Sequence, residues 1–376
     1  MKPPRLQALG VALGVFVTIG FTLQLLGGPF WHRPPPAPPC QPHTHVVFLK
    51  THKTGGSSIV NVLHRFGHGR GLRFALPHRY QFGYPLPFRA PRVRGYPEGA
   101  PFDILCHHMR FNLPEVQKVM PNDSFYFSIV RDPASLGESS FRYFRGAAAA
   151  FRNSPSLGQF LAQPTRFYRY GERGNHFARN LLWFDFGLPD RPKNSQEIQA
   201  SLAFLDRTFP LVLVAEHFDE SLVLLRDALC WPEGSVDSFA HNSRSRHGAA
   251  RASGAAHAEQ LRAWHNLDWQ LYLHFNSSFW ARAEAFGMQR LRREVSRLRQ
   301  RRERLARQCL RGAGPVPAHD IPDGNLRPFQ PPGGDSVLGF ALRDGLEPGM
   351  RELCLRMAMP ELQYKDLLER VQFGAR

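Results

Sequence analysis

The segment Phe48–Gly67, FLKTHKTGGSSIVNVLHRFG, combines groups that bind anions with a group that moves protons. Lys50 and Lys53 flank His52, and a Gly-Gly-Ser-Ser run follows. Glycine lets the backbone approach an anion closely, and the first N–H groups of a helix beginning near Ser57 would point at that anion. The segment therefore predicts a phosphate-binding turn that also carries an imidazole.

This turn differs from the phosphate loop of nucleotide triphosphatases. Those enzymes have the spacing G-x-x-x-x-G-K-[ST] and an acidic residue that helps to hold magnesium. Here Lys53 and Thr54 precede the glycines, and no apolar strand ends in a matching Asp. We therefore expect a phosphodiester or mixed-anhydride ligand that is bound without a metal.

A second anion-binding element lies in the segment FSIVRDPASLGESSF. Arg131 follows a predicted strand, and Ser139 lies in the predicted helix beyond it. A guanidinium group can donate two hydrogen bonds to one phosphate, and the hydroxyl can add a third. Either element alone is common in ordinary turns, but the two together after the first turn predict a ligand with two phosphate groups.

The elements that position these residues alternate along the chain. Buried-strand patterns lie at 45–50, 103–111, 124–130 and 209–215. Helical patterns lie at 57–67, with Ser57 and Ser58 as candidate caps, at 133–145 and at 218–231. This alternation predicts an α/β, P-loop-like fold with a central parallel sheet in three layers. Residues 68–101 are rich in Gly, Pro and aromatic residues and predict a long surface loop.

The C-terminal part of the chain has a different character. Residues 288–308 place apolar side chains at near-heptad positions among many arginines. Two interpretations remain open: a solvated helix packed along one narrow stripe, or the seam of a homodimer or a track for a polyanion. Residues 311–335 predict an irregular connector, and Pro360 predicts the first position of the last helix.

The N-terminus predicts a membrane anchor. Residues 8–26 are apolar and uncharged after Lys2 and Arg5, and a helix of that length spans about 28 Å. The basic flank predicts a cytosolic N-terminus and a lumenal body. We expect a cytoplasmic tail at 1–7, a transmembrane signal anchor at 8–28, a Pro-rich stem at 29–44 and a lumenal domain at 45–376. A cleaved signal peptide is the alternative.

Composition limits the partners. Lys and Arg number 48 and Asp and Glu number 31, which gives a net charge of +17. This excess favours acidic glycans, lipid headgroups or a polyphosphorylated ligand. Nucleic acid is not expected, because no zinc-finger, helix-turn-helix or RNA-binding aromatic motif is present.

The sequons and cysteines fit an oxidising, lumenal compartment. Asn122 and Asn276 begin N-x-S sequons and are candidate glycosylation sites. The five cysteines form no CxxC pair, so we expect no metal site. One or two disulfides and one remaining thiol are expected, but the sequence leaves the pairing open.

These motifs resemble those of the sulfotransferases that use 3′-phosphoadenosine 5′-phosphosulfate (PAPS). LKTHKTGGSS resembles their 5′-phosphosulfate loop, and IVRDPASLGESSF resembles their 3′-phosphate motif. Within this superfamily the chain is similar to the galactose 3-O-sulfotransferases, which include cerebroside sulfotransferase. The similar stretches include CHHMRFNLPEVQKVMPND, RNLLWFDFG and MPELQY, and they extend over about 45–365.

The resemblance implies a Golgi type II membrane enzyme. It would transfer a sulfuryl group from PAPS to the 3-hydroxyl of β-galactosyl residues on glycoprotein glycans, glycolipids or both. Lys53 would contact the leaving group, with Lys50 as an auxiliary cation. The remaining expected donor ligands are Thr54, Gly55, Gly56, Ser57, Ser58, Arg131 and Ser139, with Asn242 and Arg244 in a loop that closes over the donor.

The general base and the acceptor site are less sharply defined. His108 of CHHMRF and His52 are both candidates for the base, with His108 slightly preferred. Arg110, Arg179 and Asn180 are candidates for recognising the sugar. The chain departs from the family pattern at the Gly55-Gly56 pair, at Gly137 and at His107. Two alternatives stay open: transfer to another acidic polysaccharide, or an inactive glycan-binding relative.

Overall fold

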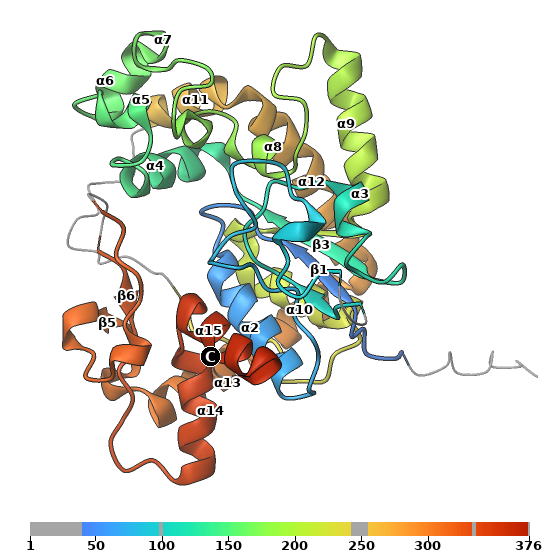
Figure 1. The fold of residues 1–376 in the computed structure, drawn as a ribbon, viewed down its shortest axis with the longest axis vertical. Coiled ribbons are helices and arrows are strands. Elements are labelled where there is room, and N and C mark those ends of the chain that lie inside the picture. The colour runs from blue at the N-terminus through green and yellow to red at the C-terminus, as the bar shows by residue number, and fades with distance from the viewer. Residues whose placement is uncertain (1–39, 98–100, 242–254, 333–335, 375–376) are drawn as a thin grey trace, which may run out of the picture. The chain divides into compact units, whose positions relative to one another are not determined.

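The computed structural model describes residues 40–97, 101–241, 255–332 and 336–374. The compact unit Pro42–Arg376 carries all of the elements discussed below. At its centre lies a parallel sheet of four strands, which confirms the predicted central parallel sheet (Figure 1). The strands lie in the order β2-β1-β3-β4, which the sequence alone does not predict. The strands are β1 Val46–Leu49, β2 Ile104–Leu105, β3 Phe125–Val130 and β4 Leu211–Val214. Every residue of β1 and β4 is buried, as expected for strands with helices over both faces.

Three helices follow three of the strands. Helix α2, Gly56–His68, follows β1, and α4, Pro133–Tyr143, follows β3. Helix α10, Phe218–Ala228, follows β4 after a short 3₁₀ turn. In parallel α/β sheets, ligands bind beyond the carboxyl ends of the strands. The loops from β1 to α2 and from β3 to α4 are therefore the segments to inspect for a site.

The remaining helices enclose this core (Figure 1). Helix α12, Asn266–Phe286, packs with α10 against β4, and α11, Ala255–Trp264, packs against α4. Helices α14, Pro348–Ala358, and α15, Glu361–Phe373, pack on α2. The other helices are α3 Leu113–Val116, α5 Ala149–Arg152, α6 Leu157–Ala162, α7 Pro164–Phe167, α8 Leu181–Asp185, α9 Ser195–Thr208 and α13 Met288–Cys309.

Two segments predicted as loops contribute buried side chains or a strand to the fold. In 68–101 the side chains of Phe74, Phe82 and Phe88 are completely buried, because this segment covers an edge of the sheet beside β2. The expectation of a surface loop was therefore wrong for its aromatic residues. The connector begins with a 3₁₀ turn, Arg311–Ala313, and contains a short strand, β5 Val316–Pro317, which pairs with β6 Leu338–Gly339.

Helix α13 packs along one narrow stripe. Leu291, Val295 and Leu298 are buried, and the helix lies against α10 of the same chain. Arg299 and Arg301 on its polar side pair with Asp219 and Asp237. The interpretation as a solvated helix packed by one stripe is confirmed. The apolar stripe of α13 is buried against the same chain.

A disulfide joins Cys309 at the end of α13 to Cys354 of α14, while Cys106 is a buried free thiol. Both findings agree with the expected disulfide and leftover thiol. Within the described ranges, no helix is both long enough and apolar enough to cross a bilayer. The predicted anchor at 8–28 lies outside the described residues.

Candidate active site

The loop from β1 to α2 has the backbone of an anion-binding turn. Lys53 and Gly55 adopt left-handed conformations, with φ of 62° and 84°. At Gly56 an added Cβ would lie 3.0 Å from Cγ of Lys50, so a side chain there would crowd the lysine. The two glycines therefore permit the turn and the close approach of Lys50.

Helix α2 presents its N-terminus without a side-chain cap. Gly55 is the cap residue, so Ser57 and Ser58 do not cap the helix as expected. The first N–H groups of such a helix carry partial positive charge and favour an anion. Gly55, Gly56 and Ser57 line a cavity of about 1000 Å³.

Residues from both predicted phosphate motifs meet in this cavity. Lys53, Arg131 and Ser139 line it. The Nη1 atom of Arg131 donates to the Lys53 carbonyl at 2.8 Å, which ties the end of β3 to the first loop. The Nζ atom of Lys53 lies 3.4 Å from the centroid of the Tyr143 ring on α4. The structure thus places two cationic groups and a hydroxyl around one volume.

Two predicted donor ligands turn away from the cavity. The Thr54 hydroxyl donates to the Thr51 carbonyl at 3.1 Å. The Ser58 hydroxyl donates to the Phe239 carbonyl at 3.2 Å and accepts from the His241 N–H. Both serve the packing of the loop and the helix. Asn242 and Arg244 lie outside the described residues.

Lys50 is paired with an acidic residue that no sequence motif indicates. Its ammonium group forms a buried ion pair with Glu361, the first residue of α15. Ser57 also donates to Glu361, at 3.0 Å. Burial alone would raise the pKa of Glu361, but Lys50 and His107 hold that pKa well below its usual value. The Glu361 carboxylate therefore binds Lys50 and Ser57, two residues of the proposed anion site.

His52 is held by a buried carboxylate. Asp185, at the end of α8, accepts from the His52 backbone N–H at 2.8 Å, and Nδ1 of the ring lies 3.0 Å from each carboxylate oxygen. Tyr84 donates to the same carboxylate at 2.9 Å. Since a carboxylate only accepts, Nδ1 carries the ring proton and Nε2 is the ring nitrogen with a free lone pair. Burial, followed by Asp185, raises the pKa of Tyr84 well above its usual value, so Tyr84 remains a donor.

His108 lies directly against His52. The two rings stack at 3.9 Å between centroids and 8° between planes. Nδ1 of His108 donates to the Lys50 carbonyl at 3.0 Å. Burial, then His52 and Lys50, lower the pKa of His108 well below its usual value. Two positive charges on stacked imidazoles would repel each other, and the pKa of His108 is lowered, so His108 stays neutral.

The candidate acceptor residues lie at a second, neighbouring cavity of about 590 Å³. Arg179 and Asn180 line it, together with aromatic and charged side chains. The main aromatic and charged members are Tyr168, Tyr170, His176, Trp183, Asp190 and Arg191. Tyr84 lines the first cavity, Pro85 lines the second, and the Tyr84 ring contacts His176 at 5.2 Å between centroids. The two cavities therefore adjoin at Tyr84.

The three candidates contribute unequally to this second cavity. Arg110 pairs with Asp190 at 2.8 Å and stacks over Phe184, so it braces the wall. Asn180 accepts from the Leu267 N–H at 3.2 Å, which ties it to the start of α12. Arg179 stacks over Trp264 at 4.5 Å while lining the cavity, which leaves it the best placed to meet a ligand.

The two sequons differ in their surroundings. Asn122 is exposed in a turn before β3, where a glycan can be attached. Asn276 is half-buried within α12. Asn122 is therefore the more accessible candidate.

The missed residues left weak traces in the sequence. Asp185 is the single charged residue in the apolar run LLWFDFG, and such an isolated carboxylate calls for a buried partner. Glu361 directly follows Pro360, which proves to precede the first residue of α15. Neither feature identifies the residue that the carboxylate contacts, because that residue is distant in the sequence: Glu361 and Lys50 are 311 positions apart.

Comparison with known proteins agrees with this architecture. The family model for galactose-3-O-sulfotransferase matches residues 17–372. Galactose-3-O-sulfotransferase 4 of Homo sapiens is 49% identical over 98% of this chain and 94% of its own length. Galactose-3-O-sulfotransferase 2 of Homo sapiens is 48% identical over 88% and 84%, and galactosylceramide sulfotransferase of Bos taurus is 43% identical over 86% and 78%. The chain belongs to the galactose-3-O-sulfotransferase family.

Proposed function

We propose that this chain transfers a sulfuryl group from PAPS to the 3-hydroxyl of β-galactosyl residues. The observation that carries the proposal is the single cavity lined by the uncapped start of α2, Lys53, Arg131 and Ser139, with His52 in its wall. These groups suit a donor with a phosphosulfate at one end and a phosphate at the other. The reaction itself, sulfuryl transfer to galactose, is inferred from membership of the galactose-3-O-sulfotransferase family.

The cationic groups would stabilise the leaving phosphate. As the S–O bond breaks, its electron pair passes to the 5′-phosphate, and negative charge grows there. Lys53 and the N–H groups at the start of α2 are placed to receive that charge, so no metal is needed for this step. Arg131 and Ser139 would hold the 3′-phosphate. We infer that Glu361 releases Lys50 when the more highly charged donor enters.

We infer that His52, rather than His108, is the general base. Nε2 of His52 would take the proton of the 3-hydroxyl while the oxygen forms its bond to sulfur. Asp185 would stabilise the imidazolium that results, much as a buried aspartate does in a hydrolase triad. His108 has no carboxylate on its ring, and its environment opposes a charge. His108 would instead position His52 by stacking and anchor the Lys50 carbonyl.

The second cavity is the proposed acceptor site. Its tyrosine and tryptophan side chains offer apolar faces for sugar rings, and Arg179 and Asp190 offer groups that can bind hydroxyls. A galactose at the Tyr84 boundary could extend towards His52, while the rest of the acceptor occupies the second cavity. Glycoprotein glycans and glycolipids remain the two acceptor classes, and one of the relatives is named for galactosylceramide.

We further propose a Golgi membrane location with the catalytic domain in the lumen. The support is the apolar run 8–26 behind a basic flank, together with the disulfide Cys309–Cys354.

An acceptor panel tests the proposed function. The purified full chain is incubated with radiolabelled PAPS and with galactosylceramide, N-acetyllactosamine, a core-1 disaccharide or a sulfated polysaccharide. Label on a galactose-terminated acceptor supports the proposal, and label only on the polysaccharide contradicts it. Retention on agarose bearing 3′-phosphoadenosine 5′-phosphate (PAP) is measured in parallel. Retention without any transfer would indicate a glycan-binding relative that has lost catalysis.

A further inference from the structure

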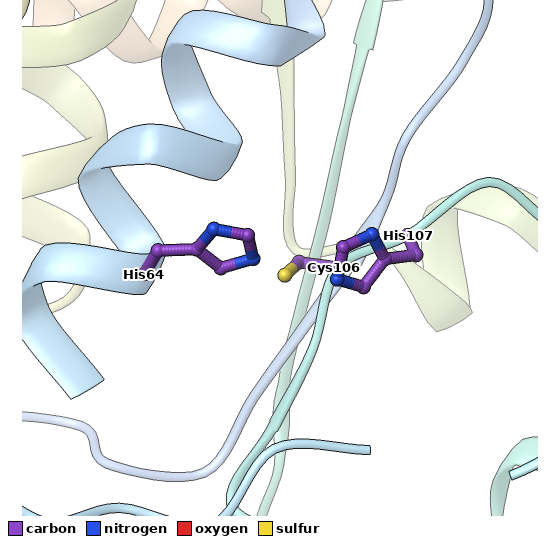
Figure 2. Close-up of side chains that lie close together, drawn as sticks. All are labelled: His64, Cys106 and His107. Atoms are coloured by element: carbon purple, nitrogen blue, oxygen red, sulfur yellow. The ribbon is translucent and has the colours of Figure 1, made fainter. Parts of the chain in front are cut away.

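Three potential metal ligands converge in the interior, behind the larger cavity and outside its lining. His64 projects from α2, and Cys106 and His107 lie directly after β2 (Figure 2). One ligand atom from each lies within 4.8 Å of the others. All three side chains are buried, with at most 1% of their surface exposed. The spacing of the cysteines did not predict this cluster, because its ligands come from segments about 40 residues apart and two of them are histidines.

Neither imidazole has a hydrogen-bond partner among the described residues. Both nitrogens of His64 and both nitrogens of His107 are buried without one. Nδ1 of His107 lies 3.6 Å from Oε1 of Glu361, which is too long for a hydrogen bond. Buried polar groups nearly always form a hydrogen bond, so two adjacent imidazoles without one need an explanation.

Other buried histidines of the described chain do not share this property. Nδ1 of His265 accepts from the Asn180 N–H at 3.0 Å. Nε2 of His241 lies 2.8 Å from the Met357 carbonyl. His52 and His108 are bonded to Asp185 and to the Lys50 carbonyl. Nε2 of His176 is also buried without a partner, but among the described residues only His64 and His107 have both ring nitrogens in that state.

We propose that His64, Cys106 and His107 bind one structural Zn²⁺ ion. Two imidazoles and a thiolate are ligands that zinc prefers, whereas calcium and magnesium require oxygen. Zinc–ligand bonds of about 2.0–2.3 Å place the donor atoms of a tetrahedral site roughly 3.3–3.7 Å apart. Small side-chain rotations close the cluster to that size. Water or the nearby Glu361 carboxylate takes the fourth position.

Binding has a defined balance of protons and charge. The Cys106 thiol loses its proton to solvent as the sulfur–zinc bond forms, and each imidazole supplies a lone pair without releasing a proton. The ion gains a neighbouring carboxylate in Glu361, which also pairs with Lys50. Zinc would thus fasten α2 to the segment that carries His108. This role is structural, and no step of sulfuryl transfer passes through the ion.

Metal analysis tests this proposal independently of sulfotransferase activity. The full chain is purified in detergent without metal-affinity chromatography, and zinc is measured by mass spectrometry. We expect about one zinc ion per chain in the wild type and almost none in Cys106→Ser and His107→Asn. His319→Asn is the matched control, because His319 is exposed and should leave the zinc content unchanged. Equal zinc in the wild type and in Cys106→Ser would overturn the site.

A second measurement separates loss of metal from loss of fold. Addition of Co²⁺ to the chelator-treated wild type should produce a thiolate-to-cobalt charge-transfer band. Chelation should lower the Tm of the wild type, Zn²⁺ should restore it, and the Tm of Cys106→Ser should respond to neither. A wild-type chain without zinc, without the cobalt band and with an unchanged Tm would contradict the proposal. A chain that binds Cu⁺ but not Zn²⁺ would contradict the zinc assignment.

Discussion

His52 is held by Asp185 at two points: its backbone N–H donates to the carboxylate at 2.8 Å, and its ring Nδ1 lies 3.0 Å from both carboxylate oxygens. One buried acid therefore sets both the path of the loop and the orientation of the ring. The same loop carries Lys53, whose backbone carbonyl accepts from Arg131. The proposed base and the lysine of the proposed donor site thus lie in one loop, which Asp185 and Arg131 hold from two sides.

The first prediction concerns Asp185. Asp185→Asn keeps the size of the side chain but removes the charge that stabilises an imidazolium at His52. We expect kcat to fall about 10²-fold, with little change in KM for PAPS, because Asp185 does not line the donor cavity. Steady-state kinetics with both substrates varied would measure the split. Asp206→Asn is the control, since Asp206 pairs with His274 at the surface. An unchanged kcat in Asp185→Asn would show that Asp185 does not assist His52.

The second prediction separates the two histidines. His52→Ala should lower kcat by about 10²–10⁴-fold, because the 3-hydroxyl then lacks its base. His108→Ala should cost less than about tenfold, because it loses a stacking partner rather than a proton acceptor. Turnover is compared at saturating PAPS, with PAP affinity as a check on folding. The opposite order would assign the base to His108.

The third prediction concerns the buried ion pair. Glu361→Gln leaves Lys50 charged and buried without its carboxylate, which should destabilise the fold by about 3–5 kcal/mol. PAP should then raise the Tm of this variant more than that of the wild type, since a phosphate can replace the lost charge. Glu303→Gln removes a surface pair on α13 and serves as the control. Equal Tm values for Glu361→Gln and the wild type would show that the pair is dispensable.

The fourth prediction is a loss of stability in acid. Burial is the main cause that lowers the pKa of His241 to about 4 and that of His265 to about 3. Below the unfolded pKa of about 6.5, the unfolded chain binds protons that the folded chain excludes, so stability is lost as the pH falls towards these values. Each histidine should cost roughly 2 kcal/mol between pH 6.5 and pH 5.

Tm measurements at several pH values check this trend. His265→Gln should show a weaker decline below pH 6.5 than His319→Gln, which changes an exposed histidine. Parallel declines in the two variants would refute the assignment to His265.

Much of the fold could be predicted from the sequence, because the strands of the sheet are short runs of apolar residues. Residues such as Val46 and Leu213 lie in runs without polar residues, and this pattern belongs to strands covered on both faces. The anion-binding loop was also predictable, since its glycines and the start of α2 follow one another along the chain. Arg131 and Ser139 were assigned from the strand and helix that carry them, and they line the same cavity as Lys53.

The partners across the fold could not be predicted in this way. His52 and Asp185 are 133 positions apart, and no periodic pattern links them. The same limit applies to Gly137, which the sequence marked only as an unusual residue within a helix. In the structure an added Cβ there would lie 2.6 Å from Cδ2 of Leu261, so Gly137 allows α4 and α11 to pack closely. Contacts of this kind arise from tertiary packing, and the local sequence does not identify the partner.

The most direct test of the account compares two acceptors that differ at one position. Purified wild-type chain and Lys53→Ala are each incubated with radiolabelled PAPS and either methyl β-galactoside or its 3-deoxy analogue. We expect a sulfate ester on the 3-oxygen with the wild type and the normal galactoside, and no transfer in the other three reactions. Equal labelling of the two galactosides, or full activity of Lys53→Ala, would contradict it.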